Sequence, residues 1–384
     1  MEKAIKVMTV FGTRPEAIKM APLVLKLKND NRFEEITVVT AQHRQMLDQV
    51  LNVFKIKPSY DFDIMSKSQS LSSITNKVLT GMDDAIEQEH PDIVLVHGDT
   101  TTSFSAGLSS FYHKIPLGHV EAGLRTWDKY SPYPEEMNRQ MVDDLADLYF
   151  APTTRSKDNL VKENHPVHNI FVTGNTAIDA LRETVRDNYN HDVLQKINPN
   201  HRIILVTMHR RENQGKPMER VFKAIKEVVD GIPDIEIIYP VHLSPRVEKL
   251  AHEILGNDPR IHLIKPLDVV DFHNLIKRSY FIMTDSGGVQ EEAPSLNKPV
   301  LVLRNTTERP EGVASGALKL IGTEPDNVRK EMLELLTDKL EYHIMSEASN
   351  PYGDGKASDR IINAIAYYFD PDHNPRPDDF AGVL

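Results

Sequence analysis

Hydrophobic residues in this chain gather in short runs rich in valine, isoleucine and leucine, and a longer stretch of mixed polarity follows each run. Runs of this length fit buried β-strands, whereas the longer stretches fit amphipathic helices. Strands that alternate with helices are typical of a parallel sheet covered on both faces. The pattern therefore predicts an α/β protein.

The expected strands fall into two sets, separated by a polar region around Arg182–His201. A chain of 384 residues also exceeds what one hydrophobic core usually supports. We therefore expect two doubly wound, parallel-sheet domains, residues 1–175 and 176–358, with a cleft between them. The first set is Ile5–Gly12, Ile36–Gln42, Ile93–Asp99, Leu117–Gly123, Leu148–Thr153 and Ile170–Gly174, and the second is Arg202–His209, Ile235–His242, Ile261–Leu267, Tyr280–Ser286, Val300–Asn305 and Leu318–Thr323.

Composition narrows the class of protein. The net charge of −11 opposes binding to nucleic acids or anionic membranes, because such partners recruit basic surfaces. The chain has no cysteine, which excludes disulfides, thiolate metal sites and cysteine nucleophiles and favours the cytoplasm. Met1–Val10 shows no secretion signal, and the apolar runs are too short to cross a membrane.

Polar motifs follow several of the expected strands. In open α/β sheets, ligands bind beyond the carboxyl ends of the strands, at the point where the strand order reverses. We therefore expect the functional site to be built from these motifs. They are GTRPE after the first strand, HGDT after the third, GHVEAGLRT after the fourth, HRREN after the seventh and SGGVQEE after the tenth.

The tenth strand leads into a glycine turn and a predicted helix start at Ser286, Gly287 and Gly288. Exposed backbone N–H groups there can bind a phosphate, because the helix dipole favours negative charge. Glu292, one turn later, can accept hydrogen bonds from both ribose hydroxyls, as carboxylates do in other nucleotide sites. The alternative is an ordinary tight turn with a helix cap.

Positive side chains stand at the other loop starts and could clamp a pyrophosphate. Three of them have a structural alternative: a solvated helix face for Lys19, an ion pair with Glu212 for Arg211, and a pair with Glu308 or Glu311 for Arg309. The candidates are Arg14, Lys19, His209, Arg210, Arg211 and Arg309.

The first half carries three carboxylates, Asp99, Glu121 and Glu135, at strand ends or in loops. Asp99 could instead cap the following helix, and Glu135, like Glu136, also suits a helix N-terminus. Glu121 lies in an apolar setting where an unpaired carboxylate would be costly. The sequence contains neither G-x-G-x-x-G after a strand nor G-x-x-x-x-G-K-[ST], so it supports no dinucleotide cofactor or P-loop. We expect no cofactor and no metal.

Taken together, the motifs resemble those of the bacterial non-hydrolysing UDP-N-acetylglucosamine 2-epimerases from about Lys6 to Gly355. The resemblance implies a glycosyltransferase-B fold, two Rossmann-like domains with the substrate in the cleft, and a C-terminal segment, 359–384, that returns to the first domain. It also implies a homodimer. The motifs are GTRPEAIKMAP, TAQHRQML, HGDTTT, GHVEAGLRT, PEEMNRQ, VTGNTAID, HRREN, TDSGGVQEEAPSLNKPVLVLRNTTERPEGV and NPYGDG.

The same resemblance implies roles for individual residues, with UDP-GlcNAc as substrate and as effector. Two positions depart from the family pattern. Leu267 replaces a glutamine of some relatives, and Ser68 replaces an arginine that helps some relatives bind the effector, so we expect a weak effector site. The implied catalytic residues are Asp99, Glu121, Glu135 and His209; the substrate contacts are Arg14, Lys19, Arg210, Phe272, Ser286, Gly287, Gly288, Glu292 and Arg309; the effector contacts are Gln42, His43, Gln45, Arg210 and His242.

The chemistry implied is a reversible inversion at C2 that supplies UDP-ManNAc for cell-surface polysaccharide synthesis. The C2 proton of a GlcNAc unit is not acidic, so the family eliminates UDP to a glycal and adds it back. Three alternatives remain: a hydrolysing epimerase that releases ManNAc and UDP, a glycosyltransferase of the same fold, and a nucleotide-sugar sensor without activity.

Overall fold

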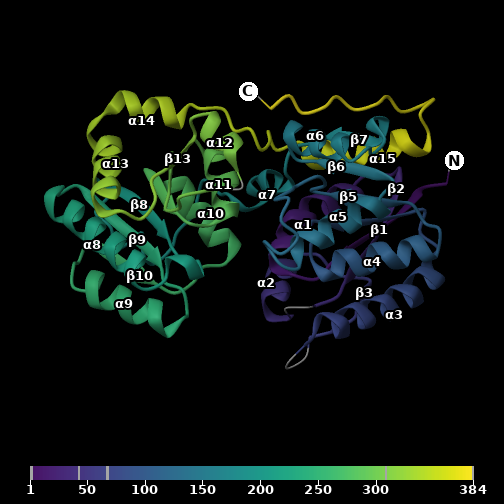
Figure 1. Cartoon of the computed structure of the whole chain (residues 1–384), viewed down its shortest axis with the longest axis horizontal. Coiled ribbons are helices and arrows are strands. Elements are labelled where there is room, and N and C mark those ends of the chain that lie inside the picture. The colour runs from purple at the N-terminus through teal and green to yellow at the C-terminus, as the bar shows by residue number, and fades with distance from the viewer. Residues whose placement is uncertain (1–2, 42–43, 66–68, 308, 383–384) are drawn as a thin grey trace. The chain divides into compact units, whose positions relative to one another are not determined.

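The computed structural model describes residues 3–41, 44–65, 69–307 and 309–382, which form two compact units (Figure 1). Unit 1 contains the chain up to Glu183 together with Tyr352–Gly382, and unit 2 contains Thr184–Pro351. Each unit has its own parallel sheet with helices around it. The expected fold class of two Rossmann-like domains is therefore confirmed.

In the described part of unit 1, seven parallel strands form one sheet in the order β3-β2-β1-β4-β5-β6-β7. The chain builds outward in one direction from β1 and then in the other from β4, so the strand order reverses between these two strands. The strands are β1 (Ile5–Phe11), β2 (Phe33–Val39), β3 (Tyr60–Asp61), β4 (Ile93–His97), β5 (Leu117–Val120), β6 (Leu148–Ala151) and β7 (Ile170–Val172).

The helices of unit 1 form two layers. α1 contacts α2 and α15, whereas α4 contacts α3 and α5. The central strands are apolar on both sides because both faces of the sheet are covered, and all five residues of β4 are buried. The helices are α1 (Arg14–Lys28), α2 (Arg44–Phe54), α3 (Leu71–Glu89), α4 (Thr101–Tyr112), α5 (Glu135–Leu145), α6 (Thr154–Lys162), α7 (Thr176–Thr184) and α15 (Ala357–Phe369), with a 3₁₀ turn at Val167–Asn169.

The edge strand β3 is absent from the sequence-based expectation. It has two residues, paired as Tyr60 with Val38 and Asp61 with Val39, and its sequence alternates between polar and apolar side chains. A strand this short leaves no recognisable hydrophobic run. At the other edge, the irregular segment after α15 lies along β7, where Arg376 donates to the carbonyl of Ile170 and the Phe380 N–H donates to that of Val172.

Unit 2 repeats the plan with six described parallel strands in the order β10-β9-β8-β11-β12-β13, and the order reverses between β8 and β11. The strands are β8 (Arg202–Thr207), β9 (Ile235–Pro240), β10 (Ile261–Ile264), β11 (Phe281–Thr284), β12 (Val300–Val302) and β13 (Leu318–Leu320). The helices are α8 (Lys216–Gly231), α9 (Pro245–Leu255), α10 (Val269–Arg278), α11 (Gly287–Glu292), α12 (Pro310–Ala314), α13 (Pro325–Thr337) and α14 (Lys339–Ser346), with 3₁₀ turns at Arg211–Asn213 and Ala293–Leu296.

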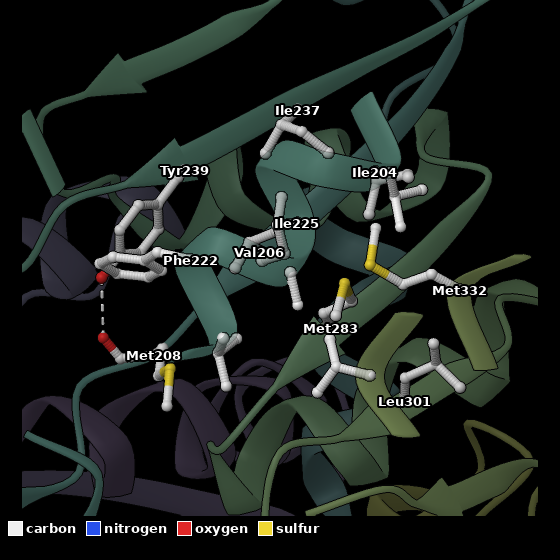
Figure 2. Close-up of a cluster of buried hydrophobic side chains, with 14 of the residues drawn as sticks. Ile204, Val206, Met208, Phe222, Ile225, Ile237, Tyr239, Met283, Leu301 and Met332 are labelled. Atoms are coloured by element: carbon white, nitrogen blue, oxygen red, sulfur yellow. Dashed lines mark hydrogen bonds between the residues drawn. The ribbon is translucent and has the colours of Figure 1, made fainter. Parts of the chain in front are cut away.

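An aromatic pair in the core of unit 2 fixes the end of β8 (Figure 2). The rings of Phe222 and Tyr239 meet edge to face with centroids 5.4 Å apart. The buried Tyr239 hydroxyl donates a hydrogen bond of 2.9 Å to the carbonyl oxygen of Met208 (Figure 2). Burial raises the pKa of Tyr239 well above its ordinary value, so the hydroxyl remains a donor. The core thereby holds the residue that directly precedes His209.

One buried carboxylate in unit 1 gives a prediction about stability. The side chain of Glu35 has no exposed surface and accepts hydrogen bonds from Thr9 and Thr37. Burial raises its pKa, although these hydrogen bonds and Lys28 oppose the shift. A raised pKa in the folded state means that ionised Glu35 is penalised on folding, so its contribution to stability falls as pH rises.

We therefore expect Glu35→Gln to be better tolerated at pH 8 than at pH 4.5. Thermal unfolding of both proteins at the two pH values measures this, and the midpoint of the variant should rise relative to the parent as pH increases. A difference in midpoint that is independent of pH, or that moves in the opposite direction, would contradict the expectation.

Candidate active site

The predicted motifs of unit 1 follow β1, β4 and β5, which lie side by side around the reversal of strand order. Gly98, directly after β4, has a φ of +64°, and Glu121, directly after β5, has a φ of +68°. Glycine adopts this left-handed region freely, but for glutamate it carries a conformational cost. A strained residue at the carboxyl edge of a sheet is typical of a functional site.

Glu121 is the centre of a buried ionic cluster. Its carboxylate receives Lys19 Nζ at 2.7 and 2.8 Å and lies 2.9 Å from Nε2 of His97. Asn175 Nδ2 donates a longer hydrogen bond of 3.3 Å. The side chains of Lys19, His97 and Glu121 are 15%, 5% and 8% exposed, so the alternative of a solvated helix face for Lys19 is wrong.

The charges around Glu121 determine its protonation. Burial acts to raise the pKa of this carboxyl, but Lys19 and His97 outweigh burial and hold its pKa well below the ordinary value. Glu121 is therefore ionised at neutral pH.

Asp99 is paired with Arg139 of α5 through a short hydrogen bond, and its backbone carbonyl accepts from Asn138 Nδ2 at 2.9 Å. Its side chain is 28% exposed, the largest exposure among these paired groups. The helix-cap alternative for Asp99 is wrong, because Thr100 caps α4 by accepting the N–H of Ser103. The Asp99 carboxylate is thus partly accessible to solvent at the edge of the sheet.

The loops after β1 and β4 are joined by Glu16, which sequence reasoning missed. One carboxylate oxygen accepts the N–H groups of Gly12 and Thr13 at 3.1 and 2.8 Å. The other accepts the hydroxyls of Thr100 and Ser103 at 2.7 and 3.0 Å. Glu16 is 2% exposed, so its role is to hold the two loops together.

The structure separates two neighbouring glutamates at the start of α5. Glu136 is fully buried and accepts the N–H groups of Thr126 and Trp127, which gives it a structural role. Glu135, the first residue of the helix, is half-buried. Arg14, the first residue of α1, is likewise half-buried.

In unit 2 the motifs follow β8 and β11, again beside the reversal of strand order. Asp285 is fully buried and joins the two loops. Its carboxylate accepts the backbone N–H groups of His209 and Arg210 at 3.0 and 2.9 Å and the Asn213 amide at 2.9 Å. The His209 side chain is 46% exposed, so a well-anchored backbone presents an accessible imidazole.

Arg309 lies against the glycine turn that follows β11. A Cβ atom at Gly287 would come within 2.6 Å of Nη1 of Arg309, so only glycine permits this approach. Arg309 Nε donates to Glu291 at 2.8 Å, a partner that the sequence did not suggest. Ser286 and Gly288 flank the same turn and are half-buried. The predicted phosphate-binding elements of unit 2 therefore lie together.

The expected ribose carboxylate, Glu292, lies at the end of α11 with its side chain 13% exposed and 3.4 Å from Nε2 of His273. The other ring nitrogen of His273 lies 2.7 Å from the hydroxyl of Thr184, so the buried histidine orients Glu292. Phe272 is partly buried and packs against the hydrophobic core.

The structure describes only some of the expected effector residues. Gln42, His43 and Ser68 lie outside the described residues. Gln45 is exposed on α2 of unit 1, and the side chain of Arg211 is not described. In unit 2 the exposed His242 lies near His209, with ring centroids 6.1 Å apart, and Arg210 Nε donates to the carbonyl of Asp285.

The described residues show neither a metal-binding cluster nor a membrane-spanning helix. They contain no group of three or more histidine, aspartate or glutamate side chains that could hold a metal ion. None of the helices in that part of the chain combines the length and apolar character needed to cross a membrane.

Comparison with known proteins identifies close relatives. The family model described as UDP-N-acetylglucosamine 2-epimerase matches residues 25–366. The UDP-N-acetylglucosamine 2-epimerase of Bacillus subtilis is 58% identical over 99% of this chain and all of its own length. A Staphylococcus aureus protein solved with UDP is 55% identical over 98% of this chain and 100% of that chain, with a TM-score of 0.89. The Neisseria meningitidis UDP-GlcNAc 2-epimerase, solved with UDP-GlcNAc, is 46% identical over 94% of this chain and 100% of that chain, with a TM-score of 0.85.

The ionic cluster gives a prediction about Glu121. Lys19→Met removes a positive charge that stabilises the ionised carboxylate, so the pKa of Glu121 should rise. Carboxyl-carbon NMR titration measures this, with Glu121→Gln identifying the signal. Lys28→Met is the control, since Lys28 pairs with Glu35 instead. If the Glu121 signal titrates at the same pH in Lys19→Met as in the parent, Lys19 does not set its charge.

Proposed function

The chain belongs to the UDP-N-acetylglucosamine 2-epimerase family, and we propose that it is a non-hydrolysing epimerase that reversibly interconverts UDP-GlcNAc and UDP-ManNAc. The observation that carries the proposal is the ionised Glu121, held by Lys19 and His97 at the edge where Asp99 also ends a strand. This arrangement supplies proton-transfer groups, which an inversion at carbon requires.

We propose that the residues of unit 2 bind the UDP moiety. Arg309 and the turn at Ser286–Gly288 provide positive charge and backbone donors for the phosphates, and Glu292 accepts from the ribose hydroxyls. Phe272, which precedes His273 in α10, would provide a platform for uracil. Buried anchors support this set, since Glu291 holds Arg309 and His273 holds Glu292. A pre-positioned set loses little conformational entropy when the nucleotide binds.

The reaction that fits these groups is elimination followed by addition. The C1–O bond breaks and its electron pair leaves with the UDP oxygen, while a base removes the C2 proton to give a glycal. One of the β-phosphate oxygens of UDP then attacks C1, and an acid delivers a proton to the opposite face of C2. Arg14, His209 and Arg309 stabilise the charge that develops on the leaving phosphate.

Acid and base roles fall to the carboxylates of unit 1. Glu121, held ionised, is suited to accept a proton from C2, and Lys19 is the donor closest to that carboxylate. Asp99 pairs with a different cation, Arg139, and is more exposed. Groups whose environments differ in this way can address opposite faces of the sugar. Glu135 is the third candidate.

The wider role follows from the same proposal. The product would serve cell-surface polysaccharide synthesis in the cytoplasm, and the enzyme would act as a homodimer. UDP-GlcNAc would also act as an effector through Gln42, His43, Gln45, Arg210 and His242. Because serine at position 68 cannot supply a charged phosphate contact, this effector site would be weak.

Hydrogen exchange at C2 tests the reaction directly. UDP-GlcNAc incubated with the chelator-treated protein in deuterated water, without added NAD, should give UDP-ManNAc that carries deuterium at C2. A proton NMR time course follows it. Product that retains its original hydrogen would contradict elimination, and free ManNAc as the main product would indicate the hydrolysing alternative.

Substitutions should separate chemistry from binding. Asp99→Asn, Glu121→Gln and His209→Asn should each lower kcat by a factor of about 100 or more, because each removes a proton-transfer group or a charge stabiliser. Arg14→Ala and Arg309→Ala should weaken substrate affinity more than the two carboxylate substitutions do, because they also lose contacts with the pyrophosphate. Asp326→Asn, an exposed carboxylate on α13, is the control. Near-normal turnover in both Asp99→Asn and Glu121→Gln would refute these roles.

A further inference from the structure

A buried histidine lies beneath the two candidate carboxylates of unit 1. His119 of β5 has no exposed surface, and both of its ring nitrogens have oxygen partners. Nδ1 lies 2.6 Å from Oδ1 of Asp143, and Nε2 lies 2.7 Å from the backbone carbonyl oxygen of Gly98. Neither Asp143 nor His119 belongs to the set of site residues considered above.

These contacts determine where the hydrogens are. A backbone carbonyl only accepts hydrogen bonds, so Nε2 of His119 must carry a hydrogen. Oδ2 of Asp143 accepts Arg125 Nη2 at 2.7 Å and the N–H of Gly123 at 3.2 Å, as an ionised carboxylate does. An ionised carboxylate only accepts, so Nδ1 must also carry a hydrogen. His119 is therefore a buried imidazolium.

Neighbouring charges support that state. Burial acts to raise the pKa of Asp143, but His119 and Arg125 outweigh burial and lower it. Arg125 in turn donates to Glu163 at 2.9 and 2.5 Å. Positive and negative groups thus alternate from the buried His119 to Glu163, whose side chain is 25% exposed. The Tyr149 hydroxyl, whose pKa is raised by burial and by Asp143, donates to the Ala146 carbonyl nearby and adds no charge.

The network ends on the two loops that carry the candidate carboxylates. Through His119, Asp143 holds the carbonyl of Gly98, the residue before Asp99. Through its second oxygen, it holds the N–H of Gly123, two residues after Glu121. Glu121 has a φ of +68°, which carries a conformational cost for a residue other than glycine, so its loop needs external support.

We propose that Asp143 is a positioning residue, whose charge keeps His119 doubly protonated so that the imidazolium fixes the turn carrying Asp99 in register with Glu121. The inference rests on the proposed roles of these two carboxylates. Asp143 and His119 touch no substrate in this account and act through the backbone.

Replacing Asp143 with asparagine tests the role of the charge. Asparagine has the same shape as aspartate and can donate a hydrogen bond to Nδ1 of a neutral His119, whose Nε2 still donates to the carbonyl of Gly98. The substitution therefore removes charge and rigidity from the loop but leaves it folded. We expect kcat to fall about ten- to a hundredfold, the usual effect of removing a group that orients a reacting group. KM for UDP-GlcNAc should change little, because the proposed UDP contacts are elsewhere. His119→Gln should act in the same way.

Glu236→Gln provides a matched control in unit 2. Glu236 is a buried carboxylate that lies 3.0 Å from Nδ1 of His201 and 2.6 Å from Nε2 of His262, near the amino end of β9. Its loss removes a comparable histidine–carboxylate cluster without touching a proposed catalytic loop. Measured well below the unfolding midpoint of each variant, kcat should remain at the parental level in Glu236→Gln.

A spectroscopic measurement tests the network independently of activity. In ¹⁵N–¹H spectra of histidine side chains, His119 should show two protonated nitrogens across neutral pH, with His119→Gln identifying the signal. Asp143→Asn should convert that signal to a neutral tautomer. A neutral His119 in the parent would overturn the inference, as would unchanged kcat in a folded Asp143→Asn or in His119→Gln. A parent with the imidazolium signature but without epimerase activity would refute the proposed function instead.

Discussion

The pairing of buried carboxylates at the carboxyl edge of the first sheet is the interaction on which the candidate site depends. An ionised carboxylate removed from water is costly unless charges or donors surround it. Glu16, Glu121 and Asp143 are each nearly or fully buried, and each meets that requirement differently. Glu16 uses backbone N–H groups and hydroxyls, Glu121 uses Lys19 and His97, and Asp143 uses His119 and Arg125.

These hydrogen bonds and ion pairs also hold the loops at the strand ends in place. Glu16 bonds groups from the loops after β1 and β4, so satisfying its charge also joins those loops. Asp143 holds the loop after β5 directly and reaches the loop after β4 through His119. Asp285 has the corresponding role in unit 2, where it anchors the loop that carries His209 to the end of β11. The proposed reacting and binding groups can then remain more exposed, as Asp99 and His209 are, without losing their positions. Rigid support beneath accessible side chains is the arrangement that pre-organised sites require.

Local pattern was enough to predict much of this organisation. Apolar runs such as Ile93–His97 identify buried parallel strands, and the motifs that follow them lie at the strand ends as expected. The two-residue strand β3 could not be found, because it has no hydrophobic run. The sequence also does not reveal the partners of the carboxylates. His97 and Arg139 look like ordinary strand and helix residues, and only the fold shows that they contact Glu121 and Asp99. Sequence reasoning could offer Asp99 as a helix cap, and only the position of Thr100 excludes that role.

The central claim is that the C1–O bond of the substrate breaks and re-forms, and that the charged groups fixed at these strand ends make this possible. Positional isotope exchange tests it most directly, using UDP-GlcNAc with ¹⁸O in the oxygen that bridges C1 and the β-phosphate. If UDP is eliminated and added back, the label should appear in the non-bridging positions of the β-phosphate in recovered UDP-GlcNAc, at a rate comparable to epimerisation. Epimerisation that proceeds while the label stays in the bridge would show that the bond remains intact and would contradict the account.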